Sequence, residues 1–310
     1  MRDRGRVIVG TRGSVLALRQ TENVISAMHR AWPDVEISIE TIRTTADRFP
    51  DREFERLPGI GFFVKELEVA LLEGRIDLAV HSMKDLPAES VGGLLIAAVP
   101  EREDPRDVLV SRDGGGLRSL ARGARVGTGS PRRAAFLRAA RSDLRIVPVR
   151  GNVETRLRKL DAGEMEAVCL ASAGLRRIGL AERATEILPM DVMLPAAGQG
   201  ALGVQARDGD EAAALAASLD HPISRAAVDA ERAMLHRLQG GCRLPVGAHA
   251  SIDGSMLTIL GAVVAPDGSA VLRGSRNGSP GEGARLGTEL AGELLDRGAG
   301  AILPMEGAAR

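Results

Sequence analysis

The feature that most constrains this chain is a regular alternation of short apolar segments and amphipathic segments along its first two thirds. Short apolar runs are typical of buried strands, whereas apolar residues three or four positions apart are typical of helices. Alternation of the two types predicts an α/β fold with a largely parallel sheet. The expected strands are residues 6–10, 35–42, 76–80, 94–99, 125–127, 144–149, 167–171 and 201–206.

Helical segments follow most of these strands, and several begin at a residue suited to cap a helix. Ser14 begins a helix that is expected to run to about Trp32, and Ser130 is followed by Pro131, which fits a first turn. Further helices are expected over 62–73, 152–162 and 173–178. Residues 44–61 show no apolar period, so they are expected to form a lid or a disordered loop.

The pattern changes near residue 220. An amphipathic helix over 224–239 is followed by expected strands at 246–252, 256–264 and 270–274 and by a helix at 283–297. Because a chain of 310 residues is long for one core, these segments predict a separate α+β module. Residues 189–200, which contain prolines and glycines, are expected to form a hinge.

Polar turns follow four of the expected strands at the point where each strand ends. These turns are residues 10–14, 81–85, 127–133 and 150–152. The carboxyl ends of strands in open α/β sheets line a ligand crevice, and helix N-termini there favour anions. Arginine binds carboxylates through two parallel hydrogen bonds. The turns therefore predict a cleft for a polycarboxylate or polyphosphate, bound by Arg12, Arg132, Arg133, Arg150 and Arg156.

Several of these side chains also have a purely structural explanation. Arg132 and Arg133 could coat the start of a solvated helix. Lys84 and Asp85 suit acid–base chemistry or charge stabilisation, and an ordinary ion pair at the end of a strand is the alternative. His81 could be a histidine that is hydrogen-bonded within the fold.

The two cysteines lie in different settings. Cys242 follows Gly240 and Gly241 in a loop after a helix, and the neighbouring Arg243 favours the thiolate form. An idle loop thiol is the alternative. Cys169 lies inside an apolar strand and is expected to be packed in the core. Because cysteines and histidines do not occur at ligand spacing, no metal is expected.

The chain carries no net charge, with 41 basic and 41 acidic residues. A neutral chain has no general attraction to nucleic acid or to anionic membranes, so any anion must be bound by a local cluster. The N-terminus has no apolar leader, and no stretch approaches the ~20 apolar residues of a membrane span. We therefore expect a cytoplasmic protein without a disulfide and without nucleic-acid or membrane partners.

Five sequence blocks together resemble one protein family. In chain order they are HSMKDLP, VGTGSPRR, VRGNVETRL, LPAAGQGALG and LQGGCRLPVGAHA, and the longer block FFVKELEVALLEGRIDLAVHS agrees with them. Over residues 6–250 they resemble hydroxymethylbilane synthase, also called porphobilinogen deaminase. The resemblance implies two periplasmic-binding-protein-like α/β domains and a smaller C-terminal α+β domain. It places the first domain at 1–100 and 200–220, the second at 101–199, and the third, which carries the cofactor cysteine, at 221–310.

The resemblance also implies an activity and a cofactor. Members of the family condense four porphobilinogen molecules head to tail, with release of ammonia, into hydroxymethylbilane for tetrapyrrole and haem biosynthesis. The primer is a dipyrromethane cofactor, which would be attached to Cys242 through a thioether. The implied protein is a cytoplasmic transferase that acts on a small-molecule substrate as a monomer.

Matching the family's motifs residue by residue assigns roles to positions of this chain. Asp85 matches the family's catalytic aspartate. The implied role is that its carboxylate stabilises the azafulvenium cation left by the loss of ammonia. The implied cofactor-binding residues are Cys242, Ser82, Lys84, Asp85, Thr128, Ser130, Arg132, Arg133, Arg150 and Gly151. The implied substrate-binding residues are Arg12, Ser14, Arg150, Arg156, Arg177 and Gln199.

The chain departs from the family pattern at a few positions. Gly129 stands where serine is common, Pro131 where leucine is usual, and Ala46 where glycine is usual. The expected lid reads LPGIGFF, where a lysine often precedes the phenylalanine. Neither Asp85 nor Cys242 is affected.

Two other functions are compatible with parts of the sequence. A non-enzymatic, two-lobed binding protein for an organic anion would share the arginine-lined cleft, but it would have no need for Cys242. A thiol enzyme unrelated to pyrroles would need a base paired with the cysteine, and the sequence indicates none.

Overall fold

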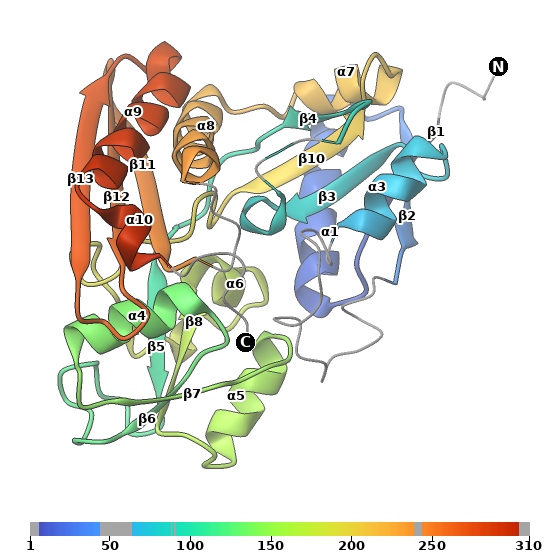
Figure 1. Ribbon diagram of the computed structural model, residues 1–310. Helices are drawn as coiled ribbons and strands as arrows, with labels where there is room; N and C mark the ends of the chain where they lie inside the picture. Colours follow the sequence, from blue (N-terminus) through green and yellow to red (C-terminus); the bar gives the residue numbers. More distant parts are fainter. Residues whose placement is uncertain (1–5, 44–63, 88, 90, 239–243, 304–310) are drawn as a thin grey trace. The chain divides into compact units, whose positions relative to one another are not determined.

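The computed structural model describes residues 6–43, 64–87, 89, 91–238 and 244–303 (Figure 1). The chain divides into two compact units, one formed by Met1–Glu103 with Ala201–Arg225 and the other by Asp104–Gly200 with Ala226–Arg310. Each unit contains a five-stranded sheet, and the second unit also contains a three-stranded sheet. The predicted combination of two α/β parts with a smaller C-terminal α+β part is confirmed.

The sheet of the first unit has the strand order β2-β1-β3-β10-β4. Its strands are β1 (Arg6–Thr11), β2 (Glu36–Thr41), β3 (Leu78–Ser82), β4 (Leu94–Ala98) and β10 (Leu202–Arg207). β1 runs parallel to β2 and β3, whereas β10 runs antiparallel to β3 and β4. The late strand β10 thus lies between two early strands, and the sheet is mixed rather than largely parallel.

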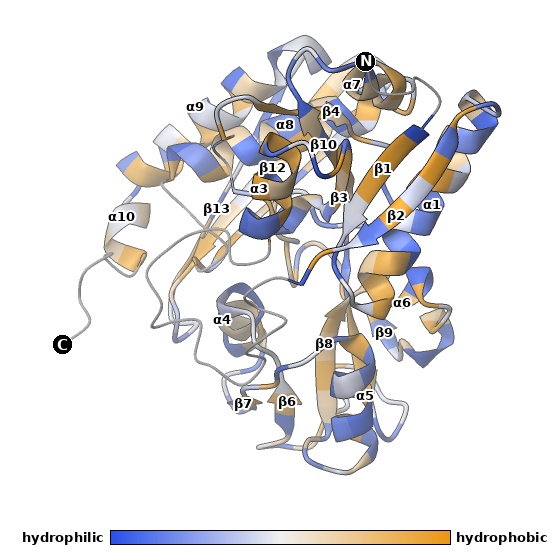
Figure 2. Cartoon of the chain, turned by 90° about the vertical axis from the view of Figure 1, so that its right-hand side faces the viewer, coloured by the Kyte–Doolittle hydropathy of each residue, from blue (hydrophilic) through white to orange (hydrophobic). Residues whose placement is uncertain are grey.

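Helices α1 (Val15–Ala31), α3 (Lys65–Leu72) and α7 (Glu211–Ala217) belong to this unit. Met28 of α1 is buried in one core cluster with Val9 and Leu78 of the sheet. Leu67 of α3 is buried in a second cluster with Ile76. Val7 and Val9 of β1 belong to the first cluster, and Ile8 packs against the second. Because both faces of β1 are covered, its middle residues form a continuous apolar run, coloured orange in Figure 2. α7 is a helix that the sequence patterns did not predict.

The five-stranded sheet of the second unit has the order β7-β6-β8-β5-β9. Its strands are β5 (Asp107–Ser111), β6 (Arg125–Gly127), β7 (Arg145–Val147), β8 (Ala167–Ala171) and β9 (Glu186–Ile187), and its helices are α4 (Pro131–Ala140), α5 (Val153–Asp161) and α6 (Ser172–Arg177). β5 runs antiparallel to β8 and β9, while β6 runs parallel to β7 and β8. This sheet is therefore mixed as well.

Strand β5 is the main element that the sequence patterns do not predict. All its residues are buried in the structure, and it lies between β8 and β9. It escapes recognition because it is short, begins at the charged Asp107 and follows the polar residues 100–106. The acidic first residue of this strand is central to the site described below.

The C-terminal part of the second unit is an antiparallel sheet of β11 (Val246–Asp253), β12 (Met256–Val264) and β13 (Val271–Gly278). Helices α8 (Pro222–Arg237), α9 (Gly283–Asp296) and α10 (Ala299–Ile302) accompany it. Met234 of α8 and Leu290 of α9 share a core with Leu257 and Ile259 of β12. Gly287 of α9 leaves no room for a Cβ against the backbone of α8, so the two helices pack closely.

Candidate functional site

The turn between β1 and α1 is shaped by a glycine and a helix cap. A Cβ at Gly10, near the end of β1, would collide with the end of the Ile76 side chain, so a larger residue there would require that side chain to shift. The Ser14 hydroxyl accepts a hydrogen bond from the Ala17 backbone N–H at 3.2 Å and caps α1, as predicted. The turn that carries Arg12 is therefore held at both ends.

A second turn follows β3 and carries Ser82, Lys84 and Asp85. The strand passes directly into a short 3-10 turn, η2 (Met83–Asp85). The Gln20 side-chain amide on α1 donates a hydrogen bond to the Ser82 hydroxyl at 2.8 Å. This bond ties the second turn to the helix that follows the first.

The two turns line one pocket in the first unit. Its polar lining consists of Arg12, Ser14, Gln20, His81, Ser82 and Asp85. Leu16, Ala17, Val64 and Val80 supply the apolar lining. The pocket thus combines a guanidinium, hydroxyls and a carboxylate, which can bind an acidic ligand and one of its N–H groups. Lys84 lies in the same turn as Asp85 and is partly buried.

His81 is a buried member of this lining, and the residue is 4% exposed. Its Nε2 lies 3.0 Å from the Gln205 side-chain oxygen on β10, and the Gln205 amide donates to Glu68 Oε1 on α3 at 3.2 Å. Burial lowers the pKa of His81 to about 4, the hydrogen bond to Gln205 opposes this effect, and the charge of Arg12 adds to it. His81 is thus hydrogen-bonded within the fold and neutral at neutral pH.

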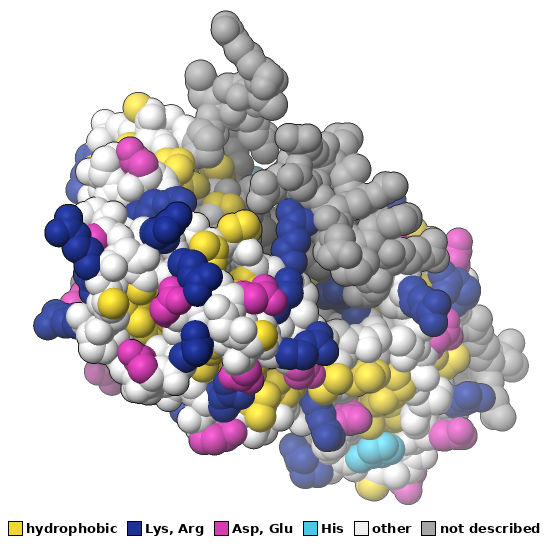
Figure 3. All heavy atoms as spheres, turned by 90° about the horizontal axis from the view of Figure 1, so that it is seen from below, with side chains coloured by type: hydrophobic (Ala, Val, Ile, Leu, Met, Phe, Trp, Pro, Cys, Tyr) yellow, Lys and Arg dark blue, Asp and Glu magenta, His cyan; other side chains and the backbone are white. Residues whose placement is uncertain are grey.

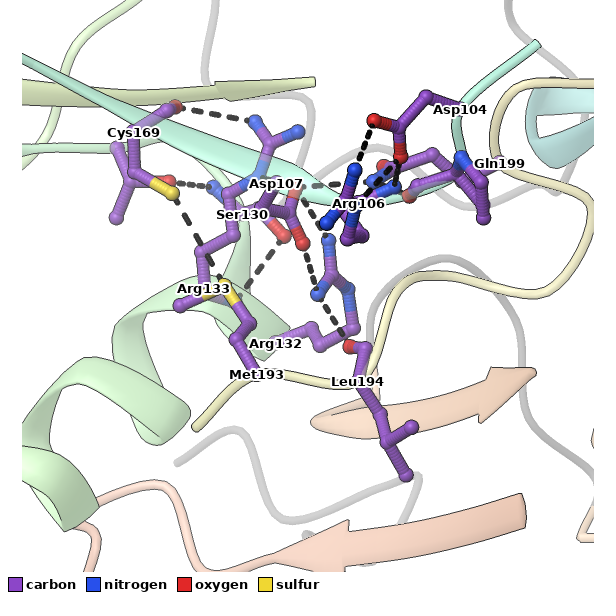
Figure 4. A network of polar contacts seen from close by, with 12 residues as sticks. Asp104, Arg106, Asp107, Ser130, Arg132, Arg133, Cys169, Met193, Leu194 and Gln199 are labelled. Carbon is purple, nitrogen blue, oxygen red and sulfur yellow. Dashed lines mark hydrogen bonds and ion pairs between the residues drawn. The ribbon is translucent and has the colours of Figure 1, made fainter. Parts of the chain in front are cut away.

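In the second unit, the start of α4 points two arginines into the protein. Ser130 caps the helix by accepting a hydrogen bond from the Arg133 backbone N–H at 3.4 Å, and Pro131 occupies the first turn, as predicted. Arg132 and Arg133 both reach Asp107 at the start of β5 (Figure 4). The N–O distances of these ion pairs are 2.7 Å and 2.8 Å.

The cluster of Arg132, Arg133 and Asp107 excludes the interpretation that the two arginines coat a solvated helix, and it adds Asp107 to the candidate site. The side chains of Arg132 and Arg133 are 4% and 7% exposed, so they do not coat a solvated helix. Burial raises the pKa of Asp107, but the charges of the two arginines outweigh it and hold the pKa well below its usual value. Sequence reasoning missed Asp107; its signal is an acidic residue directly before the apolar run Val108–Val110.

The remaining polar turns of the second unit carry Thr128 and residues 150–156. Thr128 is buried, and its hydroxyl accepts a hydrogen bond from the Ser130 backbone N–H at 3.1 Å. Gly151 has a positive φ of 101°, and its carbonyl oxygen accepts from Arg156 Nε at 2.9 Å. Arg150 precedes that glycine and is partly buried.

Gly129, which departs from the family pattern, lies where a side chain has little space. A Cβ built there would be 2.9 Å from the carbonyl oxygen of Val149. A serine at this position would require the backbone to shift, so glycine is matched to its surroundings in this chain.

Residues 189–200 contain no helix or strand, and their last residues are held by side chains from the rest of the unit. Arg177 donates to the Gly200 carbonyl at 2.6 Å, and Gln199 donates to the Pro105 carbonyl at 2.7 Å. The Glu231 carboxylate accepts from the Gly198 backbone N–H at 2.7 Å. Arg177 thus binds the last residue of this segment, and Gln199 connects the segment to the residue Pro105.

Some predicted residues lie outside the part of the chain that the structure describes. These are Cys242 with its flanking glycines and Arg243, and residues 44–61 of the expected lid. The other cysteine, Cys169, is buried in β8, and burial raises the pKa of its thiol to about 12. Cys169 is therefore packed, as predicted. Among the described residues, no helix is long and apolar enough to cross a membrane, and no group of acidic, His or Cys side chains could hold a metal ion.

Solved structures similar to this chain include two binding proteins. The methionine-binding protein MetQ is 13% identical, with 70% of this chain and 90% of that chain covered and a TM-score of 0.47. The periplasmic aliphatic sulphonate binding protein SsuA from Escherichia coli is 16% identical, with 76% and 71% covered and a TM-score of 0.41.

Family models and curated relatives cover most of the chain. Residues 7–215 match the family described as porphobilinogen deaminase, dipyromethane cofactor binding domain, and residues 226–296 match porphobilinogen deaminase, C-terminal domain. Porphobilinogen deaminase of Syntrophobacter fumaroxidans is 49% identical over 96% of this chain and 97% of its own length. That of Roseiflexus castenholzii is 50% identical over 97% and 99%. The chain belongs to the porphobilinogen deaminase family.

Proposed function

We propose that this chain condenses four porphobilinogen molecules head to tail into hydroxymethylbilane, with Asp85 as the catalytic residue. The observation that carries this proposal is the pocket of the first unit, where Arg12, Ser14, Ser82 and Asp85 lie together. Membership in the family supplies the reaction. In this pocket the Arg12 guanidinium can bind an acidic side chain of the pyrrole, and the Asp85 carboxylate can accept a hydrogen bond from the pyrrole N–H.

The substrate would be held through its acidic side chains. Porphobilinogen carries an acetate and a propionate, which match guanidinium and hydroxyl donors. We assign substrate binding to Arg12, Ser14, Arg150, Arg156, Arg177 and Gln199. Arg12 and Ser14 sit on a turn fixed by Gly10 and by the cap of α1, so their positions are set before the ligand arrives.

The residues also fit a covalently attached dipyrromethane. Arg132 Nε is buried and has no hydrogen-bond partner among the described residues, so the guanidinium retains a donor for a carboxylate. When bound, the cofactor supplies the pyrrole carbon to which the first substrate unit is joined. We assign its attachment to Cys242 and its binding to Ser82, Lys84, Asp85, Thr128, Ser130, Arg132, Arg133, Arg150 and Gly151.

Asp85 is placed to stabilise positive charge on the substrate. Loss of ammonia from the aminomethyl group of porphobilinogen leaves a cation that is spread over the pyrrole ring and its N–H. A carboxylate that accepts a hydrogen bond from that N–H lowers the energy of the cation most where it is partly shielded from water. Asp85 is partly buried in a pocket with an apolar side, which provides that shielding.

Replacing Asp85 with Asn tests this role. The variant keeps the shape of the side chain but loses its charge, so we expect kcat to fall about 100-fold or more while the Tm stays near that of the wild type. Asp34→Asn, at an exposed position of the same unit, should leave kcat unchanged. Steady-state rates with porphobilinogen measure both variants. A kcat for Asp85→Asn equal to that of Asp34→Asn would remove Asp85 from the mechanism.

We further propose that the protein acts as a monomer in the cytoplasm, without nucleic-acid partners. Its formal net charge of zero supports the absence of nucleic-acid partners, because a neutral protein lacks a general attraction to polyanions. On the face shown in Figure 3, Lys and Arg side chains are interspersed with Asp and Glu. Light scattering coupled to gel filtration should give the mass of one chain; the mass of a dimer would contradict the proposal.

A further inference from the structure

Asp107 is the buried carboxylate that pairs with Arg132 and Arg133, and it accepts four hydrogen bonds from side-chain N–H groups. Its side chain is 0% exposed. Arg132 binds it with both terminal nitrogens, at 2.7 Å and 3.1 Å, and Arg133 Nε donates at 2.8 Å. Gln199 donates the fourth hydrogen bond, to Asp107 Oδ1 at 3.0 Å. The carboxylate is therefore locked in orientation.

The two guanidinium groups are fixed by further bonds to the backbone. Arg132 donates to the Leu194 carbonyl at 2.6 Å, and Arg133 donates to the Cys169 carbonyl at 3.2 Å (Figure 4). A guanidinium is planar and rigid, so two acceptors on different sides define its plane. Asp107 accepts from Arg132 through both of its oxygens and from Arg133 through Oδ1, and so sets the two planes relative to each other.

The charge balance of the cluster has a second consequence. Asp107 offsets part of the charge of Arg132 and Arg133 in a buried place, where an uncompensated charge is costly. Without Asp107 both guanidinium groups would lose this compensation. The carboxylate therefore makes the burial of both arginines less costly.

We propose that Asp107 is a positioning residue for cofactor attachment: it orients Arg132 and Arg133 toward the carboxylates of the dipyrromethane without touching that group. The inference rests on the proposed function, which assigns the two arginines to the cofactor. It adds a residue that the family's motifs in this chain do not include, because Asp107 lies outside every block that carries the resemblance.

The test compares Asp107→Asn with Asp143→Asn. Asp143 forms an ion pair with Arg141 at 2.7 Å in the same unit, so it controls for the loss of an aspartate–arginine pair. Intact-mass spectra of each purified protein give the fraction that carries the covalent adduct. We expect that fraction, and its rate of formation when protein lacking the adduct is given porphobilinogen, to fall about tenfold in Asp107→Asn only.

A readout without cofactor separates positioning from general loss of stability. In a Cys242→Ser background no adduct can form, and inorganic phosphate serves as the probe. With Asp107 present, phosphate should move the Tm little. With Asp107→Asn, the Tm should fall by roughly 10 °C in a phosphate-free buffer and should recover as phosphate is added, because the anion offsets the charge that Asp107 no longer compensates.

Each outcome decides the matter. Normal adduct formation in folded Asp107→Asn would overturn the proposal while leaving the proposed function intact. An unmodified Cys242 in active wild-type protein would instead overturn the proposed function. If Asp107→Asn does not accumulate, Asp107→Ser purified in phosphate gives the same comparison, since the smaller side chain leaves space for the anion. Failure of both variants to fold even in phosphate would make Asp107 purely structural and end the proposal.

Discussion

At the scale of single residues, the helix caps and strand-end turns were the parts of the site most readable from sequence. Ser14 and Ser130 cap α1 and α4 as predicted, because a short hydroxyl side chain before a helical pattern satisfies a backbone N–H of the first turn. The partners of buried charges were not readable. The pairing of Arg132 and Arg133 with Asp107 joins residues far apart in sequence through a strand that has no clear pattern.

His81 leads to a prediction at this scale about stability and pH. The pKa of His81 is about 4 in the folded protein and 6.5 without burial, so the unfolded chain binds more protons between these values. The free energy of unfolding should therefore fall as pH drops from 6.5 to 4, by about 3 kcal/mol from this residue.

Urea unfolding at several pH values measures that change. His81→Gln cannot take up the proton, so its stability should depend less on pH in this window than that of the wild type. His29→Gln, at an exposed position of α1, should keep the wild-type dependence. Parallel curves for the wild type and His81→Gln would show that His81 does not titrate with unfolding.

At the scale of elements, the predicted helices and strands of the first unit lie within a few residues of the observed ones, but β10 could not be placed from its pattern. An apolar strand carries no information about which neighbours it pairs with or in which direction. The antiparallel pairing of β10 with β3 brings Gln205 to Glu68 and His81. The hydrogen bonds of His81, which lines the pocket, therefore depend on how β10 pairs in the sheet.

Helix α8 gives a prediction at the element scale, because it buries Glu231 completely. One carboxylate oxygen accepts from the Gly198 backbone N–H and the other from the Ala250 N–H of β11, each at 2.7 Å. Glu231→Gln weakens both bonds and turns one acceptor into a donor. We expect the free energy of unfolding to fall by about 2 kcal/mol or more.

The matched control is Glu289→Gln on α9, whose exposed carboxylate pairs with Arg285. An exposed pair contributes little, so this variant should lose less than about 1 kcal/mol. Chemical denaturation compares the two. Equal losses would mean that the buried carboxylate does not anchor the segment that ends at Gly200.

At the scale of the whole molecule, the sequence motifs indicate the family, whereas composition and the pattern of apolar residues lead only to an anion-binding α/β protein. Arginine-bearing turns at strand ends occur in the first unit at Arg12 and in the second at Arg132 and Arg150. Such turns suit a binding protein as well as an enzyme. The thiol at Cys242 is what separates the two functions, because a binding protein has no use for it.

The central claim is that Cys242 carries a covalent dipyrromethane, and the intact mass of the purified protein tests it most directly. The wild-type protein should be heavier than its sequence mass by one dipyrromethane. Cys169→Ala should keep that increment, because the thiol of Cys169 is buried in β8, and Cys242→Ser should lose both the increment and the activity. A catalytically active wild-type protein at its bare sequence mass would contradict the account.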